Sequence, residues 1–424
     1  VIKEIRNDFR DGKQMNRLLQ GDVGSGKTIV SIMIMLIAID NNFQSCILAP
    51  TEILANQHFK SIKELLSGLD IKIDLLTGSV KTKDRKVIHE DLLSGKTNIL
   101  VGTHAILEDI VKFKNLGLSI VDEQHRFGVA QRAKLWEKNS PPPHVLVMTA
   151  TPIPRTLAMS LYGDLDISSI KELPPGRITT KTVHKYDKNR LSVFKFLREQ
   201  IKKGRQIYLV YPLINESEKL DYKDLMDGYE SIVREFPRPD FQVSIVHGKM
   251  SSKDKDYEMG RFINKETQIL VSTTVIEVGV NVPNASVMVI ESAERFGLSQ
   301  LHQLRGRVGR GNEESYCILM TKDNLSEDSK IRVDTMVKVS DGFKLAEVDL
   351  KLRGPGDMMG TKQSGALKFK LADIIYDSEI LNNARKCAYK LLESDPRLTK
   401  KENYPIRFEI SSSSNSKNLW RYIS

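Results

Sequence analysis

The sequence predicts an α/β protein with two parallel-sheet lobes in tandem, followed by a helical hairpin region. Three observations lead to this prediction. From Arg17 onward, apolar runs of strand length alternate with longer helical patterns, as in parallel βαβ winding. The turn-forming segment Leu173-Pro174-Pro175-Gly176 interrupts this alternation, and a second series of the same kind follows it. At 424 residues, the chain is also too long for one ordinary core.

The first series of elements is expected to form a lobe over residues 1–172. Its apolar stretch Ile29–Ile39 is too short to span a membrane and is predicted to be a buried helix. The predicted strands are the short apolar runs Leu18–Leu19, Cys46–Ala49, Ile99–Gly102, Ser119–Val121 and Val145–Met148.

The second series is expected to form another α/β lobe, over residues 173–324. The alternation alone suggests that the two lobes are alike, because the second does not repeat the sequence of the first. Its predicted strands are Ile207–Tyr211, Val243–Val246, Ile269–Ser272, Val287–Ile290 and Tyr316–Met320.

A third region, residues 325–424, is predicted to begin with a helical hairpin. Ser326 is a suitable N-cap, and the acidic residues Glu327 and Asp328 suit the first turn of a helix that continues to Val339. The other predicted features are a break at Asp341-Gly342, a second helix over Phe343–Leu350, a loop at Arg353-Gly354-Pro355-Gly356 and a flexible run over Ser411–Ser416.

The composition is that of an ordinary soluble globular protein, with 40% hydrophobic and 28% charged residues. A net charge of +10 favours a polyanionic partner, because clustered basic side chains release counterions from phosphate backbones. A merely solvated basic surface explains the charge equally well at this point. The cysteines Cys46, Cys317 and Cys387 lie far apart in the chain, so we expect reduced thiols and a cytoplasmic location.

A phosphate-binding loop is predicted between the first strand and the first long helix. Glycines let backbone N–H groups face the phosphates of ATP, and the helix N-terminus adds a positive end. We expect Lys27 to neutralise the β- and γ-phosphates and Thr28 to bind Mg²⁺. The matching residues, all expected to contact the nucleotide, are Gly21, Asp22, Val23, Gly24, Ser25, Gly26, Lys27 and Thr28.

Two carboxylates follow the predicted strand Ser119–Val121, at the end of a sheet where α/β proteins hold their ligands. Asp122 is expected to hold the metal ion. Glu123 is expected to orient and polarise the attacking water. Taken alone, such a pair is more often a helix cap, but the upstream phosphate loop favours the catalytic interpretation.

A basic motif lies late in the second lobe, at Gln303-Leu304-Arg305-Gly306-Arg307-Val308-Gly309-Arg310. Arg307 and Arg310 are three residues apart, which places them on one face if the segment is helical. We predict that they contact the γ-phosphate when the lobes close and that Gln303 belongs to the same catalytic set. The alternative for an isolated motif of this kind is a solvated basic helix.

The order of these motifs resembles that of superfamily 2 helicases. The resemblance implies two RecA-like lobes that bind ATP and Mg²⁺ and contact the nucleic-acid backbone without reading its sequence. Further matching motifs are Ala49-Pro50-Thr51-Glu52, Gly102-Thr103-His104, Thr149-Ala150-Thr151, Val246-His247-Gly248 and the stretch from Ser272 to Gly279.

The same resemblance assigns residues between the main motifs. Glu277 and Gly279 are expected to contact the nucleotide. A threonine at the end of a strand is more often structural, yet several such residues fall in motifs that touch nucleic acid in this superfamily. The expected nucleic-acid contacts are Thr51, Thr103, His104, Thr149, Thr151, Thr273 and Thr274.

Over nearly its whole length the chain resembles the RecG family of branch-migration helicases. The region Arg332–Gly365 resembles the translocation motif that this family shares with transcription-repair coupling factors, and it implies a transmission role for Arg332, Arg353 and Gln363. The other stretches that carry the resemblance are Asp122–Val129, Thr151–Leu157, Leu173–Arg177 and Asp341–Phe343.

The RecG resemblance implies an ATP-dependent double-stranded DNA translocase that reverses stalled forks and migrates Holliday junctions in recombination and repair. Expected partners are branched or duplex DNA and, as a second candidate, single-stranded DNA-binding protein. A monomer without membrane association is expected. RecG proteins carry an N-terminal wedge domain that no segment of this sequence matches, so we expect a fragment with reduced junction specificity.

Three alternatives stay open. The motor of a transcription-repair coupling factor shares the stretch Thr151–Leu157. A phosphate-loop GTPase or an AAA+ ATPase would explain Lys27 and Asp122, but neither predicts the second lobe with its arginines, and a GTPase should carry an Asn-Lys-x-Asp motif that the sequence lacks. A catalytically inactive DNA-binding scaffold is disfavoured, because every expected catalytic position holds a competent residue.

Overall fold

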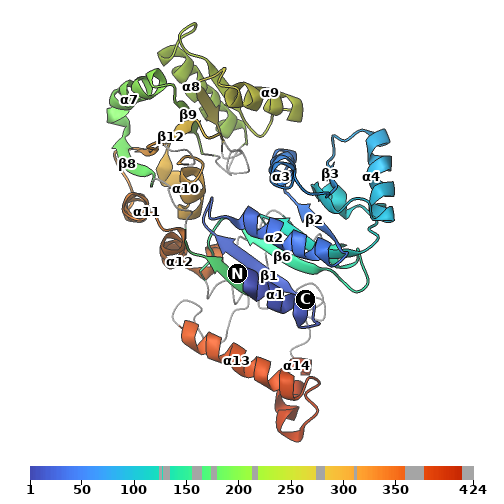
Figure 1. Cartoon of the computed structure of the whole chain (residues 1–424). Coiled ribbons are helices and arrows are strands. Elements are labelled where there is room, and N and C mark those ends of the chain that lie inside the picture. The colour runs from blue at the N-terminus through green and yellow to red at the C-terminus, as the bar shows by residue number, and fades with distance from the viewer. Residues whose placement is uncertain are drawn as a thin grey trace.

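A computed structural model describes residues 1–123, 127, 134–154, 165–172, 179–212, 218–273, 282–309, 313–358 and 377–412. Within these ranges, no side-chain description is given for residues 218–224, 252, 353–358, 378, 382 and 412. Figure 1 shows two α/β lobes, each built around a sheet, and a C-terminal group of helices set apart from both. The α/β class and the tandem parallel sheets predicted from the sequence are confirmed.

The first sheet has seven strands in the order β3-β4-β2-β5-β6-β1-β7, and neighbouring strands are parallel. All the strands predicted for this lobe are confirmed. The prediction missed β3 and β7, which form the two edges, because their sequences mix apolar and polar residues and are only partly buried. The strands are β1 (Asn16–Gly21), β2 (Gln44–Leu48), β3 (Ile73–Leu76), β4 (Ile99–Gly102), β5 (Leu116–Asp122), β6 (His144–Thr149) and β7 (Asp166–Ile170).

Helices cover both faces of this sheet. On one face Ile47 belongs to a core cluster with α1, α2 and α3, and on the other face Cys46 and Leu48 pack in a cluster with α4. Successive strand residues point to opposite faces, so one continuous apolar run supplies both clusters. The helical elements are α1 (Ile2–Arg10), α2 (Lys27–Asp40), α3 (Glu52–Leu65), α4 (Thr82–Ser94) and the short η1 (His104–Leu107).

The helix α2 is less buried than the sequence suggests. Ile34 and Met35 are fully buried, but Ile29 and Met33 are 49% and 44% exposed. The prediction of a buried helix over Ile29–Ile39 is therefore right for the inner side only. A helix that packs on a sheet buries one stripe of its surface, whatever the polarity of the remainder.

The second sheet repeats the topology of the first. Its order is β10-β11-β9-β12-β13-β8, which becomes the order of β1 to β6 when strands are counted from the first strand of each lobe, and β7 is the only addition. The predicted strands of this lobe are confirmed, and β8 was missed because it alternates between exposed and half-buried residues at an edge. The strands are β8 (Lys181–Tyr186), β9 (Gln206–Val210), β10 (Val243–Val246), β11 (Ile269–Ser272), β12 (Ala285–Ile290) and β13 (Tyr316–Thr321).

The helices of the second lobe also divide between two core clusters, one on each face of its sheet. Tyr208 packs with α9 and α10, and its neighbour Ile207 packs with α7 and α8. The helical elements are η3 (Asp187–Asn189), α7 (Arg190–Lys202), α8 (Glu218–Glu235), α9 (Ser252–Ile263), η5 (Ala293–Arg295) and α10 (Leu298–Arg305).

The predicted helical hairpin consists of α11 (Glu327–Lys338) and α12 (Gly342–Met358) and packs on the second lobe through Val333, Met336 and Leu345. Ser326 caps α11, since its Oγ accepts a hydrogen bond from Ser329 N. The predicted loop at Arg353-Gly354-Pro355-Gly356 is wrong, because α12 continues to Met358. A proline inside a helix removes one donor and crowds the carbonyl of residue i−4, at a cost of about 3 kcal/mol. Here α12 nevertheless continues past Pro355 from a first half that packs on the second lobe.

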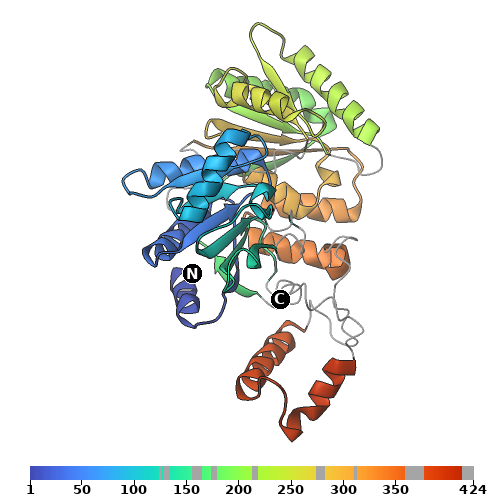
Figure 2. The same ribbon diagram turned by 90° about the vertical axis from the view of Figure 1, so that its right-hand side faces the viewer.

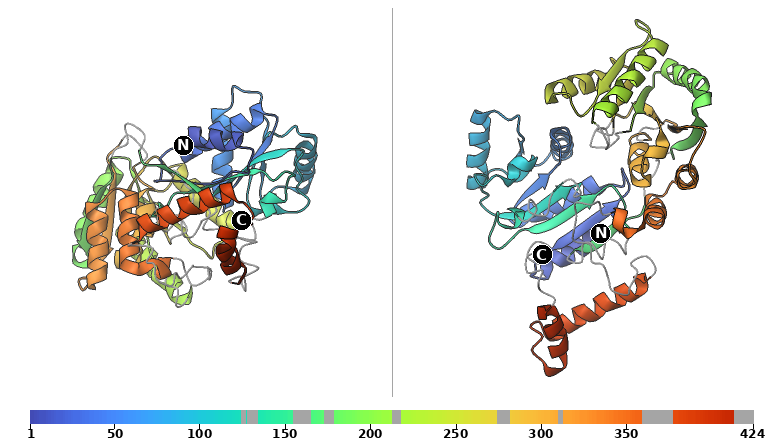
Figure 3. Two further views of the ribbon diagram at one scale, coloured as in Figure 1. Left: turned by 90° about the horizontal axis from the view of Figure 1, so that it is seen from below. Right: turned by 180° about the vertical axis from the view of Figure 1, so that it is seen from behind.

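The last described elements are α13 (Ser378–Ser394), η6 (Lys401–Asn403) and α14 (Tyr404–Ser412), which lie beyond the first lobe in Figures 2 and 3. Arg385 of α13 donates a 3.1 Å hydrogen bond to Leu165 O and lies 3.7 Å from the Asp166 carboxylate at the start of β7. Among the described residues, no helix has the length and apolar character that crossing a membrane requires.

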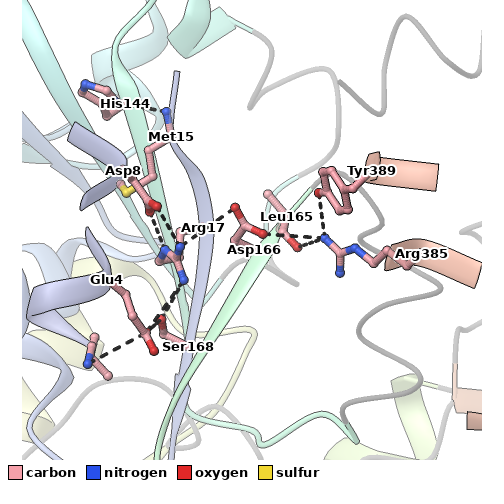
Figure 4. A network of polar contacts seen from close by, with 11 residues as sticks. Glu4, Asp8, Met15, Arg17, His144, Leu165, Asp166, Ser168, Arg385 and Tyr389 are labelled. Carbon is pink, nitrogen blue, oxygen red and sulfur yellow. Dashed lines mark hydrogen bonds and ion pairs between the residues drawn. The ribbon is translucent and has the colours of Figure 1, made fainter. Parts of the chain in front are cut away.

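A polar network at the start of β1 joins these parts (Figure 4). Arg17 bonds both carboxylate oxygens of Asp8 in α1, at 2.6 and 2.9 Å, and Ser168 Oγ of β7 at 2.9 Å. Asp166 lies between Arg17 and Arg385. The network therefore connects α1, β1, β7 and α13 at the end of the sheet opposite the predicted phosphate loop.

Candidate nucleotide-binding and active site

The predicted phosphate loop lies between β1 and α2, as its mechanism requires. Gly24 and Gly26 adopt φ values of 76° and 93°, in the left-handed region that favours glycine, and α2 begins at Lys27. Gly21 allows a close approach as well, because a Cβ there would lie 2.5 Å from Ser25 Oγ. The loop thus presents backbone N–H groups and a helix N-terminus in the arrangement that binds phosphates.

Lys27 folds back over the loop. Its Nζ donates hydrogen bonds to Gly21 O at 2.7 Å and to Asp22 O at 2.9 Å. Thr28 follows it in the first turn of α2 and is half-buried. The charge of Lys27 also acts on the nearby carboxyl groups of Asp122 and Glu123.

Asp122 ends β5 in a buried position. Its Oδ2 lies 2.8 Å from His58 Nε2, and its Oδ1 accepts a hydrogen bond from Glu123 N at 3.1 Å. Burial opposes its ionisation, but the hydrogen bond from His58 and the charges of His58 and Lys27 outweigh burial and hold the pKa of Asp122 below its usual value. An ionised carboxylate of this kind is a suitable metal ligand.

The pKa of Glu123 shifts in the opposite direction to that of Asp122. Burial, followed by the charge of Asp122, raises the pKa of Glu123 to about 7, although Lys27 and Arg307 act against the rise. Its φ of 52° is uncommon for a residue of this type. Two adjacent carboxyl groups whose pKa values are shifted apart are typical of catalytic sites. One of them stays ionised, and the other accepts a proton near neutral pH.

The second lobe reaches this site through α10. His302 Nε2 lies 2.7 Å from Asp22 Oδ1 in the phosphate loop. Gly306 approaches the same loop so closely that a Cβ would lie 2.8 Å from the Cβ of Val23. Arg307 is buried, and its charge acts on Glu123. Groups from both lobes therefore meet at this loop.

The predicted helical face that carries Arg307 and Arg310 is wrong in detail. The helix α10 ends at Arg305, so Arg307 lies in the turn beyond it, while Gln303 is buried within the helix. The C-cap of the helix, Gly306, has a φ of −68°, and Gly309 further along has a φ of 80°. The turn beyond α10, rather than a helical face, therefore carries Arg307.

The carboxyl ends of the strands carry the residues expected to contact nucleic acid. Thr51 follows β2 and caps α3 by accepting a hydrogen bond from Leu54 N. Thr149 ends β6, and its hydroxyl lies 2.8 Å from that of Thr151. Thr103 and Thr273 are buried after β4 and β11. Parallel strands end at one edge, so each sheet gathers its candidates there. His104, next to Thr103, is exposed.

Arg332, on α11, holds the hairpin to its own lobe by donating to Phe296 O at 3.3 Å and to Glu294 O at 3.1 Å. Arg353 lies in α12, but its side chain is outside the described residues. The predicted site residues that lie wholly outside the described residues are Arg310, Glu277, Gly279, Thr274 and Gln363.

Sequence reasoning missed three residues at this site. His58 and His302 have no motif of their own, although His302 directly precedes the arginine motif. Arg305 was read only as part of that motif. Its guanidinium donates to Met336 O, Val339 O and Ser340 O at 2.8–3.0 Å and lies 3.1 Å from His302 Nδ1, so it connects α10 with the turn of the hairpin.

Family models cover most of the chain. Residues 2–160 match the DEAD/DEAH box helicase model, and residues 192–312 match the helicase conserved C-terminal domain. Residues 339–424 match the model of ATP-dependent DNA helicase RecG, domain 3, C-terminal. The three matches follow one another in the order of the two lobes and the C-terminal region.

Individual relatives carry the name ATP-dependent DNA helicase RecG. The chain is 50% identical to that of Synechocystis sp. over 398 residues, which covers 94% of this chain and 48% of the relative. It is 50% identical to that of Bacillus subtilis over 410 residues, which covers 97% and 60%. A solved structure of RecG bound to a three-way DNA junction superposes with a TM-score of 0.75 at 43% identity, covering 89% of this chain and 49% of that one. The chain belongs to the RecG family of ATP-dependent DNA helicases, and it spans about half the length of most of these relatives.

Proposed function

We propose that the chain is the ATP-driven motor of a double-stranded DNA translocase that remodels branched DNA, by fork reversal and Holliday junction migration, in recombination and repair. One observation carries this proposal. Lys27, Asp122 and Glu123 of the first lobe meet His302 and Arg307 of the second at one phosphate loop. A nucleotide bound there would contact both lobes, so its binding and hydrolysis could change how the lobes are arranged, as a motor requires.

In the proposed mechanism, Thr28 and Asp122 would hold Mg²⁺, and the ion would neutralise charge on the phosphates. The ionised state of Asp122 suits this ion. Mg²⁺ in nucleotide sites usually keeps several waters and substrate phosphates as ligands, so phosphates and water would complete its shell. Glu123 orients the attacking water and accepts its proton.

The remaining catalytic groups come from the second lobe. Arg307 and Arg310 stabilise charge on the γ-phosphate in the transition state, and Gln303 supports them from α10. Glu277 and Gly279 contact the nucleotide. Since these groups lie on another lobe, hydrolysis is fast only when the lobes approach each other, and this requirement couples ATP turnover to movement.

DNA is proposed to lie along the carboxyl edges of the two sheets, where the threonines and His104 face its backbone. Arg332, Arg353 and Gln363 transmit lobe closure to the duplex. We propose three parts on this basis: an ATP-binding lobe over residues 1–172, a second lobe over residues 173–324 and a translocation region over residues 325–424. The net charge of +10 supports a polyanionic partner.

A solved RecG is bound to a three-way DNA junction, and this supports branched DNA as the substrate of the present chain. We propose that single-stranded DNA-binding protein is a second partner and that the protein acts as a cytoplasmic monomer. These proposals draw on relatives that are about twice as long as the chain described here.

ATP turnover with different DNA molecules tests the proposed function. We expect linear and forked duplexes to stimulate turnover strongly and single-stranded DNA of equal length to stimulate it less, because a translocase grips the duplex. The same assay with the Lys27→Ala variant measures contaminating activity. ATP turnover that is equal with and without duplex DNA would contradict a motor that DNA stimulates. Equal stimulation by linear and forked duplexes would restrict the proposal to duplex translocation.

A further inference from the structure

His58 of α3 and Asp122 at the end of β5 form a buried pair. The two side chains come from segments 64 residues apart, and His58 Nε2 lies 2.8 Å from Asp122 Oδ2. The residues are 6% and 8% exposed, so water does not compete freely for either group. A hydrogen bond in such a place holds its partner more firmly than one at the surface does.

The pair determines how the carboxylate is turned. Asp122 Oδ1 is held by Glu123 N at 3.1 Å, and Oδ2 is held by His58. A carboxylate that is bonded at both oxygens cannot rotate about χ2 without losing a partner. Its remaining lone pairs therefore face a constant direction, and this orientation determines how well a cation can bind.

His58 belongs to a helix with contacts in both lobes. Thr51 caps the start of α3. One residue into the helix, Ile53 packs against the core cluster of the second lobe, which contains Leu270 and Leu298. His58 lies further along the same helix and packs inward on the first lobe. A shift of α3 when the lobes move would consequently be felt at Asp122.

We propose that His58 is a positioning residue that orients the Asp122 carboxylate for Mg²⁺ and links that orientation to α3. The inference rests on the proposed function, because it assumes that Asp122 binds the Mg²⁺ of a nucleotide complex. His58 does not touch the nucleotide. Partners of this kind, which bond a metal ligand from behind, typically change metal affinity or activity about 10–100-fold when they are removed.

Three variants separate this role from simple packing. His58→Leu fills a similar volume without a donor, and His58→Gln keeps an N–H group at similar reach. His89→Ala is the control, because His89 lies on α4 and no hydrogen bond or ion pair among the described residues joins it to Asp122. Binding of a fluorescent ATP analogue to the 424-residue chain is measured while Mg²⁺ is titrated, and again with EDTA. Circular dichroism monitors folding.

We expect His58→Leu to raise the Mg²⁺ concentration at half-saturation about 10–100-fold and to leave binding in EDTA unchanged. His58→Gln should recover most of the loss, and His89→Ala should match the parent. An unchanged Mg²⁺ midpoint in a folded His58→Leu variant overturns the inference, and so does a His58→Gln variant as defective as His58→Leu. If His58→Leu does not fold, His58→Ala takes its place. Its Mg²⁺ midpoint should then be raised and that of His58→Gln should not, and equal midpoints in these two variants overturn the inference. If binding of the ATP analogue to the parent chain does not change with Mg²⁺ concentration, the proposed metal site itself is wrong.

Discussion

The two lobes share a strand order, yet the cation at the start of the first crossover helix has different partners in each. In the first lobe, β1 leads through the phosphate loop to α2, which begins with Lys27. In the second lobe, the corresponding strand β8 leads to α7, which begins with Arg190. Each lobe therefore places a cation at the N-terminus of its first crossover helix, beside the end of the strand that corresponds to β5 or β12.

The partners of these two cations differ. Arg190 forms a double ion pair with Glu291, at 2.6 and 2.8 Å, and Glu291 directly follows β12. Lys27 instead donates to the carbonyls of Gly21 and Asp22. The chain also turns similarly after both strands, since Glu123 and Ser292 adopt φ values of 52° and 47°.

The different partners of Lys27 and Arg190 show that strand order alone does not make a nucleotide site. The second lobe neutralises its cation with its own buried carboxylate and has no glycine loop at that position. The first lobe has a glycine loop there, and its lysine donates to loop carbonyls while its charge acts on Asp122 and Glu123. One strand order therefore carries the proposed nucleotide loop in one lobe and a structural ion pair in the other.

The largest expected effect contrasts the two cations directly. Lys27→Ala should lower ATP turnover by roughly two to three orders of magnitude or more, because it removes a charged donor aimed at the phosphates. Arg190→Ala should keep turnover close to that of the parent for the folded fraction. ATPase rates, normalised by circular dichroism for folded protein, measure both. Similar losses in the two variants would show that the lobes do not differ in the way described.

A smaller effect should appear in the stability of the second lobe. Glu291→Gln weakens two charge-assisted hydrogen bonds to Arg190 and should lower the free energy of unfolding by about 2 kcal/mol, a modest value because the Arg190 side chain is 33% exposed. Urea unfolding measures the loss. The double variant Arg190→Met/Glu291→Leu should recover part of it, since an apolar pair leaves no buried charge. A double variant less stable than Glu291→Gln would contradict this explanation.

A further prediction concerns Glu123 and the pH dependence of stability. Its pKa is about 7 in the folded chain, against an ordinary value of 4.5, so the folded state binds more protons than the unfolded state between these values. Stability should therefore fall as pH rises from 4.5 to about 7. Urea midpoints at about pH 5 and about pH 8 should differ less in Glu123→Gln than in the parent. Identical pH responses would show that Glu123 ionises normally.

Much of the fold follows from local pattern. Strands with continuous apolar runs, such as Cys46–Ala49 and Ile207–Tyr211, were predicted because both faces of a parallel sheet are covered. The edge strands β3, β7 and β8 were missed because a half-buried edge tolerates polar residues. The loop expected at Gly354-Pro355-Gly356 was predicted from residue type alone, which underestimates a helix already held by packing.

The sequence by itself determined the order of the two lobes, the glycine loop with Lys27 and the carboxylates after β5, because each depends on residues that are neighbours in the chain. Only the tertiary structure decided that His58 meets Asp122, that His302 meets Asp22 and that Arg190 is neutralised by Glu291. These contacts join residues 64 to 280 positions apart. No local pattern encodes them, since they depend on how the strands are ordered and how the lobes face each other.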